Sequence, residues 1–202
     1  MQRPIIKSAV FVKSAQSKKD SLNEDKSEIV FLGRSNVGKS STINAYTNKK
    51  SLAKSSSTPG KTRLINFFDI DYGDENSIYP LRLVDLPGFG YAKVSKTIKE
   101  EWQKNLVDFI TNRVSIRIFI HLRDARHPNM DIDKEVEAFI RSIIRPDQRY
   151  ITLFTKIDKL NQKERYALQK DFPGTITFTN LKPHTLEPLH KEVLKTIFGV
   201  AS

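Results

Sequence analysis

The sequence contains no cysteine in its 202 residues. This absence excludes disulfide bonds and thiolate metal sites, and it suits a reducing compartment. The sequence also lacks any apolar run near the roughly 18 residues that a membrane-spanning helix needs. No apolar segment follows the basic start of the chain, so a secretory signal is not expected. We therefore predict a cytoplasmic protein with no membrane partner.

Acidic residues are scarce relative to basic ones. The chain has 23 Asp and Glu against 34 Lys and Arg, which leaves a formal net charge of +11. A nucleotide needs only a few cations, so this excess points to a larger polyanionic partner, and in the cytoplasm the abundant polyanion is RNA. We expect no DNA partner. A generally basic, well-solvated surface is the alternative explanation.

One stretch matches the phosphate-binding pattern Gly-x4-Gly-Lys-Ser/Thr without a mismatch: Gly33-Arg34-Ser35-Asn36-Val37-Gly38-Lys39-Ser40. An apolar run precedes it, and residues 41–46 can form a helix, which is the context that this motif requires. The backbone N–H groups and the positive end of the helix dipole attract phosphate oxygens. Lys39 can reach the β- and γ-phosphates, and the Ser40 hydroxyl can ligate Mg²⁺. We predict that this phosphate loop, extended to Ser41, binds the phosphates of a nucleotide.

Strand and helix patterns alternate along the chain. Six segments have strand character: 28–32, 64–70, 81–86, 116–122, 150–154 and 175–179. The first helix is expected to follow the phosphate loop and to end at about residue 48, and three more are expected over 98–112, 132–143 and 161–171. A last helix is expected after Thr185, which can cap it. The short link between 64–70 and 81–86 indicates an antiparallel hairpin. We predict an α/β fold with six mostly parallel strands, one of them antiparallel, and helices on both faces.

Residues 1–27 are interpreted as an N-terminal extension and residues 28–202 as a single domain. In the extension, Ala9-Val10-Phe11-Val12 can form a short strand or an anchoring segment, and the polar residues 14–26 are typical of a loop. Ligands of α/β sheets bind at the carboxyl ends of the strands. The phosphate loop, Asp85 and Lys156–Asp158 all follow strands, so we expect them to converge on one site.

Asp85 ends an apolar strand and is followed by Leu86-Pro87-Gly88. An Asp in this place can bind Mg²⁺, usually through a water molecule, and the Gly88 N–H is then free to meet a γ-phosphate. The pattern Asp-x-x-Gly is weak alone. Its place directly after a strand, 46 residues beyond Lys39, supports the assignment.

The segment Thr155-Lys156-Ile157-Asp158 also follows a strand. The Asp158 carboxylate can accept hydrogen bonds from guanine N1–H and the 2-amino group, and the Lys156 stem can lie against the base. Adenine offers neither donor there, and a buried carboxylate without donors is costly, so discrimination of several kcal/mol is expected. We predict that the bound base is guanine.

Two threonines compete for the second Mg²⁺ position. Thr58 and Thr62 both lie in a basic, polar loop that contains Pro59-Gly60. Thr62 stands immediately before a strand, where a hydroxyl is held at a fixed point. We favour Thr62, with Ser40 and Asp85 as the other metal-binding residues.

These motifs and four further stretches resemble the EngB (YihA/YsxC) family of bacterial ribosome-biogenesis GTPases, in the TRAFAC class. The further stretches are Ser57-Thr58-Pro59-Gly60-Lys61-Thr62, Asn66-Phe67-Phe68, Phe89-Gly90-Tyr91-Ala92 and Asp124-Ala125-Arg126-His127. The resemblance covers about residue 9 to the C-terminus. It implies a Ras-like, three-layer P-loop GTPase fold, Mg²⁺-dependent GTP hydrolysis, a role in assembly of the large ribosomal subunit, and a requirement for normal cell division and septation. It also implies that Gly60 and Lys61 contact the nucleotide beside Thr62.

The chain departs from the family pattern in places. Arg63 and Phe89 replace a frequent Gln and Tyr, which are mild changes. The last guanine-contact segment of the family usually has Ser-Ala after its strand, and here it is Phe178-Thr179-Asn180-Leu181. Thr179 or Asn180 can still present a backbone N–H to the guanine oxygen, so 178–180 is the expected contact.

Hydrolysis is expected to be slow. In many related GTPases a glutamine after the Asp-x-x-Gly glycine orients the attacking water, and Phe89 occupies that position. No other residue is marked as a base, so only Lys39 and Gly88 are expected to contact the transition state. Unassisted turnover should be on the order of 10⁻⁴ to 10⁻³ s⁻¹, as in Ras-type GTPases. A partner or a bound K⁺ can complete the site, because Asn36 stands where related K⁺-stimulated GTPases place a ligand.

We therefore predict a monomeric conformational switch. GTP with Mg²⁺ orders loops 49–62 and 87–94, hydrolysis to GDP releases them, and the ordered form binds the large ribosomal subunit or its RNA. Two alternatives remain open: an ATP-dependent small-molecule kinase, which uses the same phosphate loop, and an RNA-binding module with a vestigial nucleotide site.

Overall fold

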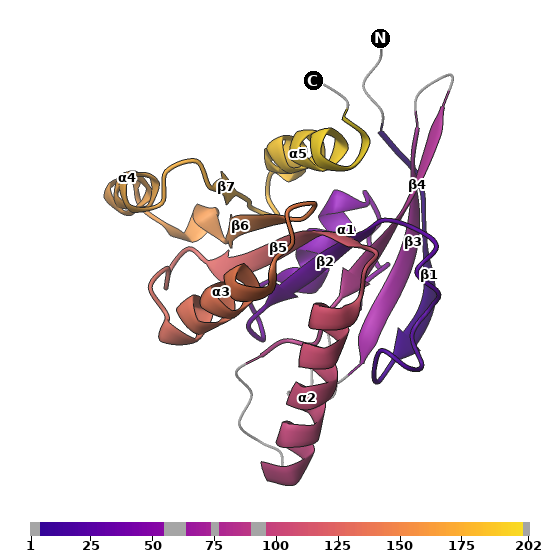
Figure 1. Ribbon diagram of the computed structural model, residues 1–202. Coiled ribbons are helices and arrows are strands. Elements are labelled where there is room, and N and C mark those ends of the chain that lie inside the picture. The colour runs from indigo at the N-terminus through magenta and orange to yellow at the C-terminus, as the bar shows by residue number, and fades with distance from the viewer. Residues whose placement is uncertain (1–4, 55–63, 74–76, 90–95, 200–202) are drawn as a thin grey trace.

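A seven-stranded sheet forms the centre of the computed structural model (Figure 1), which describes residues 5–54, 64–73, 77–89 and 96–199. The strands are β1 (Ile5–Ala15), β2 (Glu28–Gly33), β3 (Ile65–Gly73), β4 (Ile78–Asp85), β5 (Ile116–Asp124), β6 (Arg149–Thr155) and β7 (Ile176–Thr177). The helices are α1 (Lys39–Tyr46), α2 (Lys96–Asn112), α3 (Asp131–Ile143), α4 (Gln162–Asp171) and α5 (Glu187–Phe198). Two short 3₁₀ helices span Ile157–Lys159 and Pro183–Leu186.

The strand order is β1-β3-β4-β2-β5-β6-β7. β4, β2, β5, β6 and β7 pair in parallel, β3 pairs antiparallel with β4, and β1 pairs antiparallel with β3. Because β3 alone runs against the other described strands, the predicted α/β fold with one antiparallel strand is confirmed. The predicted strand number was wrong, since the sheet has seven strands and not six.

The additional strand is β1. The sequence suggested only a short strand or an anchoring segment at Ala9–Val12, whereas β1 spans 11 residues along β3. The register of this pair shifts between Ile6 and Ser8 and again between Phe11 and Lys13. These irregularities leave Val10, Phe11 and Val12 all exposed, so the alternation that identifies a strand is interrupted.

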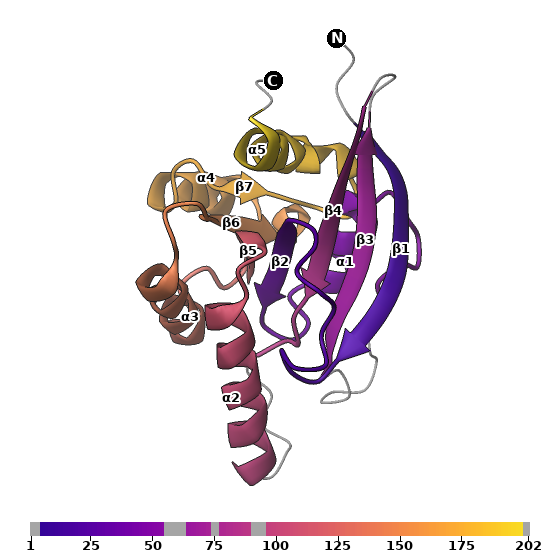
Figure 2. The same ribbon diagram turned by 45° about the vertical axis from the view of Figure 1, so that its right-hand side comes forward.

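Both faces of the sheet are covered, as the sequence predicted. Alternate side chains of β2 enter opposite layers: Ile29 and Phe31 face α1 and α5, while Val30 and Leu32 face α2 and α3. Figures 1 and 2 show the two pairs of helices on opposite sides of the sheet. The uninterrupted apolar strand therefore results from burial on both faces.

The N-termini of the last two helices, α4 and α5, are capped in different ways. Asn161 and Glu164 form a capping box at the start of α4, within the helix predicted over 161–171, and Asn161 Oδ1 accepts a hydrogen bond from Glu164 N at 3.0 Å. Thr185 was wrongly predicted as the cap of α5, whose N-cap is Leu186. The Thr185 hydroxyl instead donates to Lys182 O at 2.8 Å, because the 3₁₀ turn precedes the helix.

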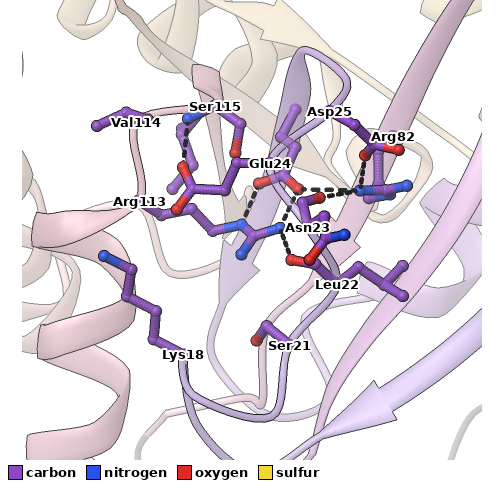
Figure 3. Close-up of polar contacts among 12 residues, drawn as sticks. Lys18, Ser21, Leu22, Asn23, Glu24, Asp25, Arg82, Arg113, Val114 and Ser115 are labelled. Carbon is purple, nitrogen blue, oxygen red and sulfur yellow. Dashed lines mark hydrogen bonds and ion pairs between the residues drawn. The ribbon is translucent and has the colours of Figure 1, made fainter.

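Buried ion pairs close the amino-terminal end of the parallel strands. Glu28, the first residue of β2, is fully buried and accepts hydrogen bonds of 2.6 Å from both Nε and Nη2 of Arg113. Arg113 also donates to Leu22 O at 2.9 Å, and Arg82 donates to Asn23 O at 2.7 Å (Figure 3). The polar loop predicted at residues 14–26 therefore starts too early, because β1 continues to Ala15, and the rest of that segment is bound to the sheet by Arg113 and Arg82.

None of the helices in the described part of the chain is both long and apolar enough to cross a membrane.

The Glu28–Arg113 pair generates a stability prediction. Glu28→Gln leaves the guanidinium buried without its counter-charge, which should lower the free energy of unfolding by about 3–5 kcal/mol. Asp147→Asn is the matched control, because Asp147 pairs with Arg117 and Arg145 while its side chain is 51% exposed. It should cost less than about 1 kcal/mol. Urea denaturation measures both, and equal losses would contradict the assigned role of the buried pair.

Candidate functional site

The carboxyl ends of four parallel strands meet at one edge of the sheet. Gly33 ends β2, Asp85 ends β4, Asp124 ends β5 and Thr155 ends β6. These strands are neighbours in the order β4-β2-β5-β6. The loops that follow them therefore lie side by side, where α/β sheets bind ligands.

The phosphate loop turns directly into α1. Gly38 is the N-cap of this helix and has a φ of 103°, a conformation that a residue with a Cβ rarely adopts. Val37 is buried, whereas Asn36 is exposed and also has a positive φ, of 62°. Ser40 and Ser41, half-buried, stand on the first turn of the helix. The loop thus presents the first N–H groups of α1, the arrangement that binds anions.

Lys39 and Asp85 form an ion pair inside the site. Lys39 Nζ donates to Asp85 Oδ1, and the two side chains are only 10% and 5% exposed. Asp85 comes from the end of β4, next to β2 in the sheet. The structure therefore brings together the cation and the carboxylate that the sequence assigned to phosphate and Mg²⁺.

The segment after β4 is bonded to the phosphate loop through its backbone. Ser35 N donates to Phe89 O at 3.1 Å, and Phe89 N donates to Gly33 O at 3.3 Å. A Cβ on Gly88 would lie 2.9–3.0 Å from Ser35 atoms, two of them backbone, so only glycine allows this approach. Leu86 is buried and Pro87 follows it. Leu86–Phe89 and the phosphate loop are thus one connected structure.

The Phe89 side chain packs into the core layer of α2 and α3. Its ring meets the ring of His121 edge-on, with centroids 5.7 Å apart. His121 is fully buried and contacts Tyr150 Oη at 2.6 Å and Asp133 Oδ1 at 3.3 Å. The half-buried Phe89 ring is therefore packed against the interior, and His121 beneath it is fully buried.

The segment after β6 is bonded to the phosphate loop as well. Thr155 Oγ1 donates to Val37 O at 2.6 Å, and Lys156 Nζ donates to Asn36 O at 2.7 Å. Lys156 has a positive φ, of 60°. The phosphate loop and the segment after β6 are therefore in direct contact, although Asn36 and Lys156 are 120 residues apart in sequence.

Asp158 faces the segment 178–180. Thr179 Oγ1 donates to Asp158 Oδ1 at 2.7 Å, and this hydrogen bond lowers the pKa of the carboxyl group below its ordinary value. Phe178 is buried and accepts a hydrogen bond from Ile157 N at 3.4 Å, whereas Asn180 is exposed. The structure therefore places the 178–180 segment beside Asp158, and the contact of this segment with guanine stays a prediction.

Asp124 and Arg126 belong to this cluster, although the sequence analysis assigned them no role. Burial opposes ionisation of Asp124, but hydrogen bonds from Arg126 and Lys156 hold its pKa well below the usual range. A signal was available, because Asp124 ends β5 as Asp85 ends β4. Asp85 was noticed through its Asp-x-x-Gly motif, and Asp124 lacks one.

Part of the predicted site falls outside the described residues, namely Gly60, Lys61 and Thr62, together with Thr58. The choice between the two threonines stays a prediction. In the described ranges, no group of three or more His, Cys, Asp or Glu side chains is arranged to hold a metal. The predicted Mg²⁺ donors at Ser40 and Asp85 are hard oxygen atoms, which this ion prefers.

A family model described as "50S ribosome-binding GTPase" matches residues 28–156. Two similar curated proteins are both named "Probable GTP-binding protein EngB". The one from Aliarcobacter butzleri is 50% identical over 194 residues, which cover 95% of this chain and 97% of the relative. The one from Campylobacter jejuni (strain 81116) is 45% identical over 196 residues, covering 97% and 99%.

Among solved structures, a crystal structure of "a probable GTP-binding protein engB" is similar in fold to this chain. Its TM-score is 0.61 at 26% sequence identity, and the match covers 86% of this chain and 100% of the other.

The Thr179–Asp158 hydrogen bond predicts a pH dependence. Thr179→Val removes the donor and should raise the pKa of Asp158 toward its ordinary value, as carbon-13 NMR of the carboxyl group would measure. Because the pKa is lowered in the folded protein, the stabilisation from this bond is present above the ordinary pKa and is lost as the pH falls through the folded value. The stability difference between wild type and variant should therefore shrink in acid.

The control for this prediction is Thr175→Val, because the Thr175 hydroxyl donates to Phe172 O and not to a carboxylate. It should leave the titration of Asp158 unchanged. Identical Asp158 titrations in wild type and Thr179→Val would contradict the assigned cause of the shift.

Proposed function

The chain belongs to the EngB family of GTP-binding proteins and is a GTPase, and from this premise we propose that it is a slow, Mg²⁺-dependent switch that acts in assembly of the large ribosomal subunit. The observation that carries the nucleotide part of the proposal is the convergence of Lys39, Asp85 and Lys156–Asp158 at the carboxyl edge of the sheet. The family does not favour the two alternatives, a small-molecule kinase or a vestigial site.

At the phosphate end, residues 33–41 bind the phosphates through the backbone N–H groups at the start of α1. Lys39 exchanges the Asp85 carboxylate for the β- and γ-phosphates, because a phosphate carries more negative charge than one carboxylate. Gly88 offers its N–H to the γ-phosphate. The backbone bonds between Ser35 and Phe89 support this role, since they hold Gly88 against the phosphate loop.

Mg²⁺ is the metal that these residues suit. Ser40 on α1 and Asp85 at the end of β4 would hold it, the latter through water, and Thr62 is the expected third residue. The bound ion would neutralise charge on the phosphate oxygens. Lys39 then keeps the leaving phosphates in place, and no role in proton transfer is assigned to it.

Unassisted hydrolysis is slow, because the side chain after Gly88 cannot orient water. The packing of Phe89 against His121 supports this proposal, since it keeps an apolar ring where related enzymes have a glutamine amide. A macromolecular partner, or K⁺ at Asn36, would supply what is missing. The loops around Thr62 and after Phe89 would respond to the γ-phosphate.

At the base end, Asp158 accepts hydrogen bonds from guanine and the Lys156 stem lies against the base. The segment 178–180 contributes a backbone N–H to the guanine oxygen. The proximity of Thr179 to Asp158 supports this arrangement, and the 19% exposure of the Asp158 side chain leaves it accessible to a ligand.

The ribosomal part of the proposal rests on charge and family. The net charge of +11 suits a polyanion larger than a nucleotide, and the matching family is described as binding the 50S ribosome. We place this function in the cytoplasm, and we expect defects in cell division and septation when it is lost, as the resemblance to EngB implies.

Base recognition can be tested with Asp158→Asn. The amide cannot accept both guanine donors, so affinity for GDP should fall by about a hundredfold or more while affinity for xanthosine diphosphate rises. Fluorescence titration measures both affinities, with Asp171→Asn at an exposed position as the control. An unchanged preference for guanine would remove Asp158 from this role.

Displacement of GDP by ATP at comparable concentrations would favour the kinase alternative.

The ribosomal role can be tested by co-sedimentation with purified large subunits. Binding should be stronger with a non-hydrolysable GTP analogue than with GDP, and it should weaken as salt rises, because counterions are released from RNA. Lys39→Ala should lose the nucleotide dependence. Equal binding with both nucleotides would contradict the switch, and no binding at low salt would contradict the ribosomal partner.

A further inference from the structure

Asp124 is a buried carboxylate at the edge of the candidate site. It is the last residue of β5 and only 8% exposed. Arg126 donates to it three times, from the backbone N at 3.1 Å, from Nε at 3.0 Å and from Nη2 at 2.7 Å. Lys156 Nζ donates to the second carboxylate oxygen at 2.9 Å. Asp124 thus connects the loop after β5 to the segment after β6.

Lys156 Nζ has a second acceptor, Asn36 O, at 2.7 Å. The ammonium therefore lies between a carboxylate of β5 and a carbonyl of the phosphate loop. Both Asn36 and Lys156 have left-handed backbone conformations, with φ of 62° and 60°; asparagine tolerates this conformation, whereas it is unfavourable for lysine. The contacts of the ammonium hold these two positions together.

Asp158, the neighbouring carboxylate, is engaged with other donors and not with the Lys156 ammonium. Asp158 accepts from Thr179, and its other oxygen lies 3.4 Å from Lys159 Nζ. Arg126 is 44% exposed and keeps its guanidinium on Asp124. Asp124 is therefore the carboxylate that sets the direction of the Lys156 side chain.

We propose that Asp124 is a positioning residue for guanine-nucleotide binding, which acts by holding the Lys156 ammonium against the carbonyl of Asn36. The Lys156 stem is then fixed where the base is to lie, and the phosphate loop and the base-binding segment form one rigid unit. This inference rests on the proposed role of Lys156 and Asp158 in base binding. It assigns the pair Asp124–Arg126 a function in the affinity for guanine nucleotides, although neither side chain needs to touch the ligand.

The test is a double-mutant cycle on GDP binding. Asp124→Asn removes the charge with little change in shape, and Lys156→Met keeps the stem but removes the ammonium. Each single variant should weaken GDP binding by about tenfold, mainly through faster dissociation, because a charge-assisted hydrogen bond is lost. If Asp124 acts through Lys156, the double variant should bind within about twofold of the weaker single variant. Multiplied losses would overturn the proposal.

Three further measurements keep this test decisive. Asp147→Asn, an exposed ion-paired carboxylate, is the control and should leave GDP affinity unchanged. The melting temperature separates a local effect from unfolding. If Asp124→Asn does not fold, Arg126→Gln at the exposed partner should weaken GDP binding by about two- to fivefold, and an unchanged affinity would overturn the proposal.

The outcome for Asp158→Asn separates this inference from the proposed function. A shift of base preference in Asp158→Asn together with unchanged GDP binding in Asp124→Asn would overturn the positioning role alone. Unchanged base preference in Asp158→Asn would overturn the base site on which the inference rests.

Discussion

The buried ion pair of Lys39 and Asp85 joins the loop after β2 to the last residue of β4. Removing either charge would leave the other buried and unpaired, which is strongly unfavourable. The ion pair therefore holds the two loops together, and the backbone hydrogen bond from Ser35 N to Phe89 O stabilises the same contact. In the proposed function, a phosphate group that binds Lys39 would compete with Asp85, and this pair would couple the charge of the ligand to the geometry of the two loops.

The two ends of the parallel strands use buried charge in opposite ways. At the amino-terminal end, Arg113 and Glu28 satisfy one another, and Leu22 O in the segment before β2 accepts a further hydrogen bond from Arg113. At the carboxyl end, Asp85 is held by Lys39 on the first turn of α1, and Asp124 is held by Arg126 and Lys156 from the segments after β5 and β6. The first end stabilises the sheet, while the second leaves polar groups where a ligand can replace them.

Much of the fold was predictable because its signals are local. The apolar run of β2 and the capping box at Asn161 each act within a few residues. β1 escaped full prediction because its two register shifts expose Val10, Phe11 and Val12 in succession. Thr185 has the composition of a helix cap, but the turn in front of α5 engages its hydroxyl elsewhere.

The residues of the candidate site also differ in whether a local sequence motif could identify them. The phosphate loop, Asp85 and residues 155–158 could be proposed as site residues from contiguous motifs, since each carries its chemistry in a few neighbouring residues. The contact of Lys156 with Asn36, its counter-charge at Asp124 and the donor Thr179 beside Asp158 became apparent only in the folded chain. These contacts follow from the strand order β4-β2-β5-β6-β7, which brings distant loops to one edge and which no local pattern encodes.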